Sequence, residues 1–188
     1  MNSVRPMPAR PGRGASASRL AEILRVDHAG ELAAVGIYRG QQAVFAAASG
    51  KSALGDRFKN LAAQEAEHLK AFDVLLNERQ VRPSLLTPVW RMAAFALGAG
   101  TALMGEKAAH ACTDAVEQVI EEHYAAQIEE LSGREPELAA RLSTFREDEL
   151  AHQAHAVEDG AREAPGYAIL SAVIRAGCRA AIRTAEKV

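Results

Sequence analysis

The feature that most constrains the fold of this chain is an internal repeat. Two sets of three residues each recur further along the sequence, the first after 86 residues and the second after 84. The recurring sets are Glu31, Tyr38, Gln41 with Glu117, Tyr124, Gln127, and Arg57, Glu65, His68 with Arg141, Glu149, His152. Units that repeat in this way pack on one another. We therefore expect two copies of one helical hairpin, related by a pseudo-twofold axis and closed into a four-helix bundle.

The segments between the breaks have helical composition. Alanine is abundant, aromatic residues make up only 5% of the 188 residues, and strand-like alternation is scarce. Glycine, serine and proline mark the ends of segments, which predicts an all-α fold in one domain. The expected helices span about 20–48, 52–79, 106–131 and 136–158, with a hydrophobic segment over 89–104 and a last amphipathic helix over 167–186.

The repeated residues include two Glu-x-x-His motifs, Glu65 with His68 and Glu149 with His152. Residues three apart share one face of a helix, so each motif points a carboxylate and an imidazole the same way. Together with Glu31 and Glu117, they supply the ligand set of a carboxylate-bridged di-iron site in a four-helix bundle. Two iron ions are the expected cofactor, because zinc more often takes Cys or three His, and calcium takes loop oxygens.

One Glu-x-x-His motif alone would fit an ordinary solvated helix face. The interpretation as a metal site depends on the two motifs occurring together within a repeat. A ligating histidine also needs an outer hydrogen-bond partner that fixes its tautomer. Asp148 and Asp114 are candidates for that role, the alternative being ordinary acids on a helix face.

Other residues near the expected ligands have two open interpretations. Tyr124 and His123 are candidate catalytic residues for proton or electron delivery, the alternative being a core tyrosine and a surface histidine. Tyr38 is the repeat counterpart of Tyr124 and has the same two interpretations. Asp27 and His28 precede Glu31 by one turn and either support it by hydrogen bonding or lie on the surface.

Charge and cysteine content exclude some classes of protein. A net charge of −2 argues against a nucleic-acid partner. Cys112 and Cys178 lack zinc spacing and are expected to be reduced thiols. Residues 1–19 carry arginine and proline but no acidic residue and no apolar core of a secretory signal. We expect them to form a disordered N-terminal segment, with a transit-peptide remnant as the alternative, ahead of a folded domain over 20–188.

Two segments, about 84–104 and 166–187, are expected to face a membrane. In the first, Trp90 and Arg91 precede an uncharged run that is too short to span a bilayer. In the last helix, basic residues recur every four positions opposite an apolar face, which is typical of a helix lying in a membrane interface. They are Arg175, Arg179, Arg183 and Lys187. The alternative is a core-facing helix with a solvated basic side.

Sequence stretches across about residues 20–183 resemble one known family. They include Arg25-Val26-Asp27-His28-Ala29-Gly30-Glu31, Gln64-Glu65, His68-Leu69, Phe95 to Leu103, Ala111-Cys112-Thr113, Ala115-Val116-Glu117, His123-Tyr124, Phe145-Arg146, Glu149-Leu150, His152 and Ala176-Gly177-Cys178-Arg179. The family that they resemble is the demethoxyubiquinone hydroxylases of ubiquinone biosynthesis. Leu32 and Ala33 depart from its pattern, which puts only local packing in doubt.

This resemblance implies a ferritin-like fold and an enzyme, a di-iron monooxygenase. It would use O₂ to hydroxylate the ring of a polyprenyl demethoxyubiquinol, with electrons from the quinol itself or from NADH, although no Gly-rich dinucleotide motif is present. Implied partners are the benzoquinol substrate, the membrane surface, other ubiquinone-biosynthesis proteins including a lipid-binding accessory protein, and a second copy of the chain. The implied location is peripheral, on the cytoplasmic side of a bacterial inner membrane or the matrix side of the mitochondrial inner membrane.

Other functions use similar ligands. A ferritin-like ferroxidase or iron-storage protein is the main alternative, but storage would favour a chain without the apolar segment. A rubrerythrin-type protein would usually carry a Cys module, and a tRNA hydroxylase would prefer wider basic patches. A non-catalytic lipid-binding protein would not need six candidate ligands.

Overall fold

The computed structural model describes residues 16–187, and this part of the chain is all-helical, as predicted, with no β-strand. It contains six α-helices and one 3-10 helix, η1. Their bounds are α1 Ser16–Ala47, α2 Ser52–Glu78, α3 Thr87–Leu103, α4 Glu106–Leu131, α5 Pro136–Glu158, η1 Ala161–Glu163 and α6 Tyr167–Ala185.

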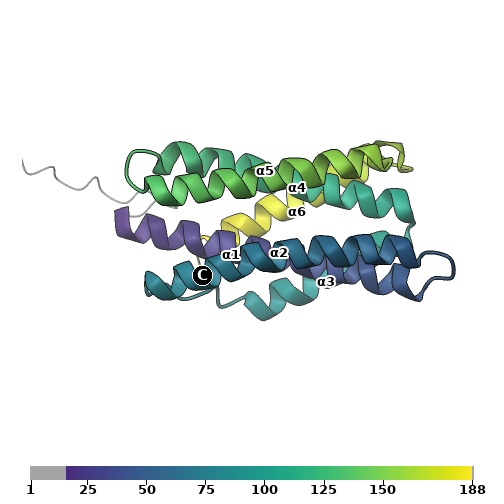
Figure 1. The fold of residues 1–188 in the computed structure, drawn as a ribbon, viewed down its shortest axis with the longest axis horizontal. Helices are drawn as coiled ribbons and strands as arrows, with labels where there is room; N and C mark the ends of the chain where they lie inside the picture. Colours follow the sequence, from purple (N-terminus) through teal and green to yellow (C-terminus); the bar gives the residue numbers. More distant parts are fainter. Residues whose placement is uncertain (1–15, 188) are drawn as a thin grey trace, which may run out of the picture.

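Four long helices form a bundle of two hairpins, α1 with α2 and α4 with α5 (Figure 1). Each hairpin is followed by a shorter helix that packs on the hairpin's own first helix: α3 on α1, and α6 on α4. The duplication therefore extends to three helices per half, although the recurring residues in the sequence lie only in the first two helices of each half. Helices α3 and α6 therefore lie on the side of the bundle that α1 and α4 form.

Helix ends follow local backbone chemistry. Gly105 and Gly166 precede α4 and α6 with φ angles of 117° and 71°, a region that favours glycine. Prolines lie in the first turns of α3 and α5, where no intrahelical N–H bond is lost. Both features place the ends close to the predicted positions.

Helix α1 begins at Ser16, four residues before its predicted start at about residue 20. The extra turn contains Arg19, whose guanidinium bonds Glu22 and also Glu130 of α4. These contacts tie the turn to the bundle. The N-terminal segment was predicted to be disordered over residues 1–19, but residues 16–19 are helical. Residues 1–15 lie outside the described part of the chain.

Helices α1 and α3 approach each other closely at two glycines. A Cβ on Gly98 would lie 1.9 Å from the carbonyl oxygen of Ile37, and one on Gly40 would lie 2.3 Å from the carbonyl oxygen of Phe95. Only residues without a side chain allow the two backbones to come this near. This contact seats α3 against the side of α1 that carries Gly36 and Gly40.

Two apolar clusters fill the bundle and reproduce the repeat. One is centred on Tyr38, Phe45 and Phe58, and the other on Tyr124, Leu131 and Leu142, the residues at the matching repeat positions. All six are buried. Cys112 and Cys178 belong to the first cluster, either buried or packed against it, and both are free thiols, as predicted.

Large apolar side chains remain exposed on α3 and α6 and in the turns beside α3. They are Leu85, Val89, Met92, Phe95, Leu103, Met104, Ile169 and Val173. The residues predicted to form one apolar face of α6 have different surroundings. Ile174 is buried in the bundle, whereas Val173 is 65% exposed. The basic side is partly engaged with α4, where Arg179 bonds Glu122 at 2.9 Å. Within residues 16–187, no helix is both long and apolar enough to cross a bilayer.

Candidate metal centre

The six side chains predicted as ligands converge in the middle of the bundle as two overlapping groups. In each group, one potential ligand atom per residue lies within 4.8 Å of the others. The groups are Glu31, Glu65, His68, Glu149 and Glu65, Glu117, Glu149, His152. Because Glu65 and Glu149 belong to both groups, the arrangement has the form of two neighbouring cation sites that share two carboxylates.

All four bundle helices contribute to this cluster. Helix α1 supplies Glu31 and α4 supplies Glu117, while α2 and α5 each supply a Glu-x-x-His pair. The i, i+3 spacing places both members of each pair on the inner face of the helix, and all six side chains are buried. The position of each group thus follows from helical periodicity combined with the pseudo-twofold packing.

Eight buried atoms in the cluster have no hydrogen-bond partner. They are Oε2 of Glu31 and Glu117, both carboxylate oxygens of Glu65 and Glu149, and Nδ1 of His68 and His152. Buried polar atoms are nearly always paired, so a concentration of unpaired ones indicates a missing ligand. Two divalent cations would satisfy these donor atoms and balance the four carboxylate charges. The donor set of oxygens and imidazole nitrogens fits iron.

Both imidazoles are oriented with Nδ1 toward the carboxylates. Nδ1 of His152 lies 2.9 Å from Glu65, and Nδ1 of His68 lies 3.4 Å from both Glu65 and Glu149. The opposite ring nitrogens face outward, Nε2 of His68 to Asp148 at 3.1 Å and Nε2 of His152 to Gln64 at 3.2 Å. Such outer partners fix the tautomer that leaves Nδ1 free to bind a cation.

The prediction of an outer role is confirmed for Asp148 and wrong for Asp114. Asp114 instead accepts hydrogen bonds from Gln153 and from Tyr167 at the start of α6. The actual partner of His152 is Gln64, which is the repeat counterpart of Asp148. One histidine thus contacts a carboxylate and the other an amide, at equivalent positions of the two halves.

Two tyrosines cross the pseudo-twofold axis. The hydroxyl of Tyr38 donates to Glu117, and the hydroxyl of Tyr124 donates to Glu31. Burial raises the pKa of both tyrosines well above the usual value, so the phenols stay protonated and act as donors. Each occupies one oxygen of its carboxylate and leaves the other oxygen, Oε2, facing the cluster.

Electrostatics in the absence of cations are strongly perturbed. Burial raises the pKa of Glu31 and Glu117 well above the ordinary value. Burial also acts to raise the pKa of Glu65, but the neighbouring imidazoles of His152 and His68 outweigh it and lower that pKa to about 2. Burial opposes a charged His152, yet Glu149 and Glu65 raise its pKa to about 9. Without metal, protons must therefore supply the positive charge that the carboxylates need.

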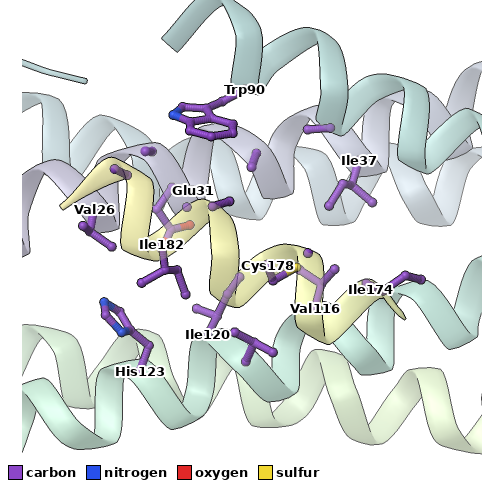
Figure 2. A pocket seen from close by; sticks show the side chains of 18 of the residues that line it. Val26, Glu31, Ile37, Trp90, Val116, Ile120, His123, Ile174, Cys178 and Ile182 are labelled. Carbon is purple, nitrogen blue, oxygen red and sulfur yellow. The ribbon is translucent and has the colours of Figure 1, made fainter. Parts of the chain in front are cut away.

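An apolar cavity of about 400 Å³ adjoins the cluster at Glu31 (Figure 2). It is bounded by α1, α3, α4 and α6, and Figure 2 shows Glu31 and Ile37 on one side, with Ile120 and Val116 on the other. Most of its lining is aliphatic. Lining residues include Val26, Ala29, Ala33, Trp90, Ala93, Leu97, Val119, Val173, Ile174, Cys178 and Ile182.

One end of this cavity is polar and contains residues whose roles the sequence left open. Asp27 is buried, and its Oδ1 accepts a hydrogen bond of 2.7 Å from Gln127. The same amide nitrogen lies 2.8 Å from Nε2 of His123. The side chain of His123 is 20% exposed and lines the cavity, so a purely surface role is wrong for it. His28 is also buried and contacts Asp73 at 3.0 Å.

Gln127 was visible in the sequence only as the repeat counterpart of Gln41, with no assigned function. A helical repeat identifies a residue as inward-facing, but it does not tell which side chain of another helix it meets. Gln41 bonds the backbone carbonyl of Ala109, whereas Gln127 joins Asp27 to His123. The absence of a polar residue at Ile37, the counterpart of His123, was the available signal that the two halves differ here.

Comparison with known proteins identifies a family for most of the chain. Residues 18–185 match the family model described as ubiquinone biosynthesis protein COQ7. The 3-demethoxyubiquinol 3-hydroxylase of Rhodospirillum rubrum is 46% identical over 178 residues, covering 95% of this chain and 82% of the relative. The human NADPH-dependent 3-demethoxyubiquinone 3-hydroxylase, mitochondrial, is 44% identical over 169 residues, covering 88% and 76%. The yeast 5-demethoxyubiquinone hydroxylase, mitochondrial, is 41% identical, covering 93% and 80%.

Proposed function

The chain belongs to the family of the ubiquinone biosynthesis protein COQ7, and from this membership we propose that it is a 3-demethoxyubiquinol hydroxylase with a carboxylate-bridged di-iron centre. The reaction adds one oxygen atom of O₂ to the ring of a polyprenyl demethoxyubiquinol. The observation that carries the proposal is the position of the two overlapping ligand groups directly beside an apolar cavity. This arrangement would let the ring of a lipid substrate enter the cavity and react next to the metal ions.

The residues that would hold the two irons are the six predicted from the sequence, of which Glu65 and Glu149 belong to both ligand groups. When bound, the irons would supply the electrons and the oxygen-binding positions that O₂ reduction requires. The protein's own contribution is positional. Tyr38 and Tyr124 hold the Glu117 and Glu31 carboxylates by hydrogen bonds, and Asp148 and Gln64 hold the two imidazoles.

Hydroxylation with O₂ also consumes two electrons and two protons and releases one water. Tyr124 is a candidate for passing a proton, because its hydroxyl contacts Glu31 and its ring lines the cavity. His123 is the neighbouring candidate. The sequence-based candidate reductant is NADH, whereas the human relative is named as NADPH-dependent. We propose a nicotinamide nucleotide as the ultimate electron source, bound without a Rossmann motif.

We place the substrate's tail at a membrane surface. Exposed apolar residues on α3 and α6 would enter the interface, and Val173 both lines the cavity and is exposed. A polyprenyl tail could then stay in the lipid while the ring enters the cavity. Peripheral attachment to a bacterial inner membrane or the matrix face of the mitochondrial inner membrane remains our proposal, as do a lipid-binding accessory partner and a homo-oligomer.

A ferroxidase would use the same six ligands, but it has no need for an apolar cavity of about 400 Å³ at the iron pair. A soluble iron substrate would need a polar path. The cavity thus favours the hydroxylase over the ferroxidase.

The decisive experiment is complementation of a strain that accumulates demethoxyubiquinone, with quinones measured by mass spectrometry and iron measured on the purified protein. We expect ubiquinone to be restored and iron to approach two per chain. Glu65→Ala and Glu149→Ala should abolish ubiquinone production and full iron loading. Glu67 is an exposed carboxylate on the same helix as Glu65, so Glu67→Ala should change neither. Persistent accumulation by a well-expressed, iron-loaded protein would refute the hydroxylase function. Full activity of a ligand variant would remove that residue from the set.

A further inference from the structure

The cavity beside Glu31 crosses the pseudo-twofold axis, and its two ends differ in chemistry. Ile37 and His123 occupy the same repeat position, 86 residues apart, and both line the cavity. Figure 2 places them at opposite ends, His123 beside Val26 and Ile182, and Ile37 toward Ile174. One end is therefore aliphatic and the other carries an imidazole. A cavity of this kind can orient a molecule that is polar at one end only.

The polar end is a connected group of three side chains. Gln127 donates one amide hydrogen to Asp27 at 2.7 Å and places the same nitrogen 2.8 Å from Nε2 of His123. With both amide hydrogens donated, Nε2 of His123 is an acceptor and its proton lies on Nδ1. Nδ1 has no hydrogen-bond partner within residues 16–187.

Asp27 has one further oxygen that lacks a partner. Its Oδ2 is buried without a hydrogen bond, and the residue lines the cavity. Burial raises the pKa of Asp27 to about 8, so near neutral pH this carboxyl holds a proton, and Oδ1 is occupied by Gln127. Oδ2 is then the oxygen that carries the proton. Asp27 and His123 thus each offer one unused hydrogen-bond donor at the same end of the cavity.

The other half of the repeat has no such group. The counterpart of Asp27 is Thr113, whose hydroxyl bonds the carbonyl of Ala109 in its own helix, and the counterpart of His123 is Ile37. Gln41 also bonds Ala109, so its amide is used for the backbone. The polar group is consequently a local departure from the repeat, located at one end of the cavity.

We infer that Asp27 and His123 recognise the ring oxygens of the quinol by hydrogen bonding and thereby select its orientation, with Gln127 as a positioning residue. This inference rests on the proposed function. A ring oxygen held at Asp27 and His123 directs the apolar tail toward Ile37, which is buried, and Val173, which is exposed. Glu31 lies between the two ends, so the ring is held next to the ligand cluster. This recognition is non-covalent, so it neither forms nor breaks a covalent bond.

The test measures binding separately from turnover. Trp90 is the chain's single tryptophan and lines the cavity, so quenching of its fluorescence by a short-tailed demethoxyubiquinone analogue reports occupancy. The iron-loaded protein is titrated without O₂, and an alkylbenzene with the same tail is titrated in competition. The alkylbenzene has the same apolar body but no ring oxygen.

We expect His123→Ile, which copies the residue at the matching position, to weaken quinone binding roughly tenfold, the effect of one lost hydrogen bond. Asp27→Leu should act similarly, whereas Asp27→Asn, which keeps a donor in the same place, should bind nearly as well as the wild type. Alkylbenzene affinity should stay within about twofold in all three. Val173→Ala, at the apolar end, should weaken both compounds in parallel.

Two results would overturn the inference: unchanged quinone affinity in folded His123→Ile, or equal losses for quinone and alkylbenzene. If Asp27→Leu fails to fold, His123→Ile and Asp27→Asn still decide the question. Failure of the wild-type protein to bind the quinone at all would count against the proposed function instead, so the two failures are distinguishable.

Discussion

The close contact between α1 and α3 makes a sharp prediction about Gly98. An added Cβ would lie 1.9 Å from the Ile37 carbonyl oxygen and 2.7 Å from the Ile37 carbonyl carbon. Both atoms belong to the backbone of α1, so no side-chain rotation relieves the overlap. Restoring an ordinary contact of about 3.4 Å requires the two backbones to move apart by roughly 1.5 Å. Gly98→Ala should therefore act as overpacking at a helix interface.

The magnitude follows from two opposing terms. Replacing glycine with alanine in a helix interior gains about 1 kcal/mol, while overpacking a well-packed site costs about 1–3 kcal/mol and sometimes more. The clash at Gly98 lies at the severe end, because the obstacle is backbone. We expect a net loss of about 1–2 kcal/mol, which lowers Tm by roughly 2–8 °C in a domain of this size.

Gly100 provides a matched control two residues away. It lies in the same helix, and a Cβ there would meet no heavy atom within 4 Å. Gly100→Ala should raise Tm by about 2–4 °C, since only the helix-propensity term applies. Thermal unfolding followed by circular dichroism measures both variants. Equal or higher stability of Gly98→Ala relative to Gly100→Ala would refute the close approach of α1 and α3.

Three further predictions concern the candidate site. Tyr124→Phe leaves Oε1 of Glu31 buried and unpaired, so it should destabilise the metal-free protein by about 1–3 kcal/mol in urea unfolding; no loss would mean that the phenol does not hold the carboxylate. Asp148→Asn should weaken one iron of the pair about tenfold in chelator competition, because the outer partner of His68 loses its charge; equal weakening of both irons would contradict this. Burial raises the pKa of Asp27 to about 8, whereas an aspartate in an unfolded chain titrates near 4, so the folded state binds an extra proton and wild-type stability falls as pH rises between these values. Asp27→Asn should lose less stability than the wild type between pH 6 and pH 8 in urea unfolding, and identical pH profiles would place the pKa of Asp27 outside this window.

The sequence was sufficient to predict features that depend on periodicity. The repeat specified which helices form hairpins, and the i, i+3 spacing of Glu65 with His68 specified a common face. Convergence of the six residues followed, because a pseudo-twofold arrangement brings equivalent inward positions together. These properties depend on spacing within one helix or on the repetition of the same positions in both halves. No knowledge of particular contacts between helices was therefore needed.

Contacts between particular side chains were not predictable in the same way. Asp114 was one of two candidate outer partners for the ligand histidines, yet Gln64 of α2 contacts His152 instead. The choice depends on how two helices cross, which composition does not encode. The packing of α3 on α1 was not predictable from the sequence either, because the function of Gly98 as a contact point depends on the position of Ile37 in another helix.

The differences between the two halves indicate how a duplicated scaffold can support a reaction on one substrate. The six candidate ligands and the two tyrosines obey the repeat, as a pair of similar cation sites requires. Departures from it occur around the apolar cavity, where His123 faces Ile37 across the pseudo-twofold axis. A fully symmetric cavity would bind a quinol ring in two equivalent orientations, only one of which presents a given ring carbon to the ligand cluster. Loss of symmetry in the cavity, combined with symmetry in the ligands, is therefore the arrangement expected of an enzyme that must hydroxylate one ring position.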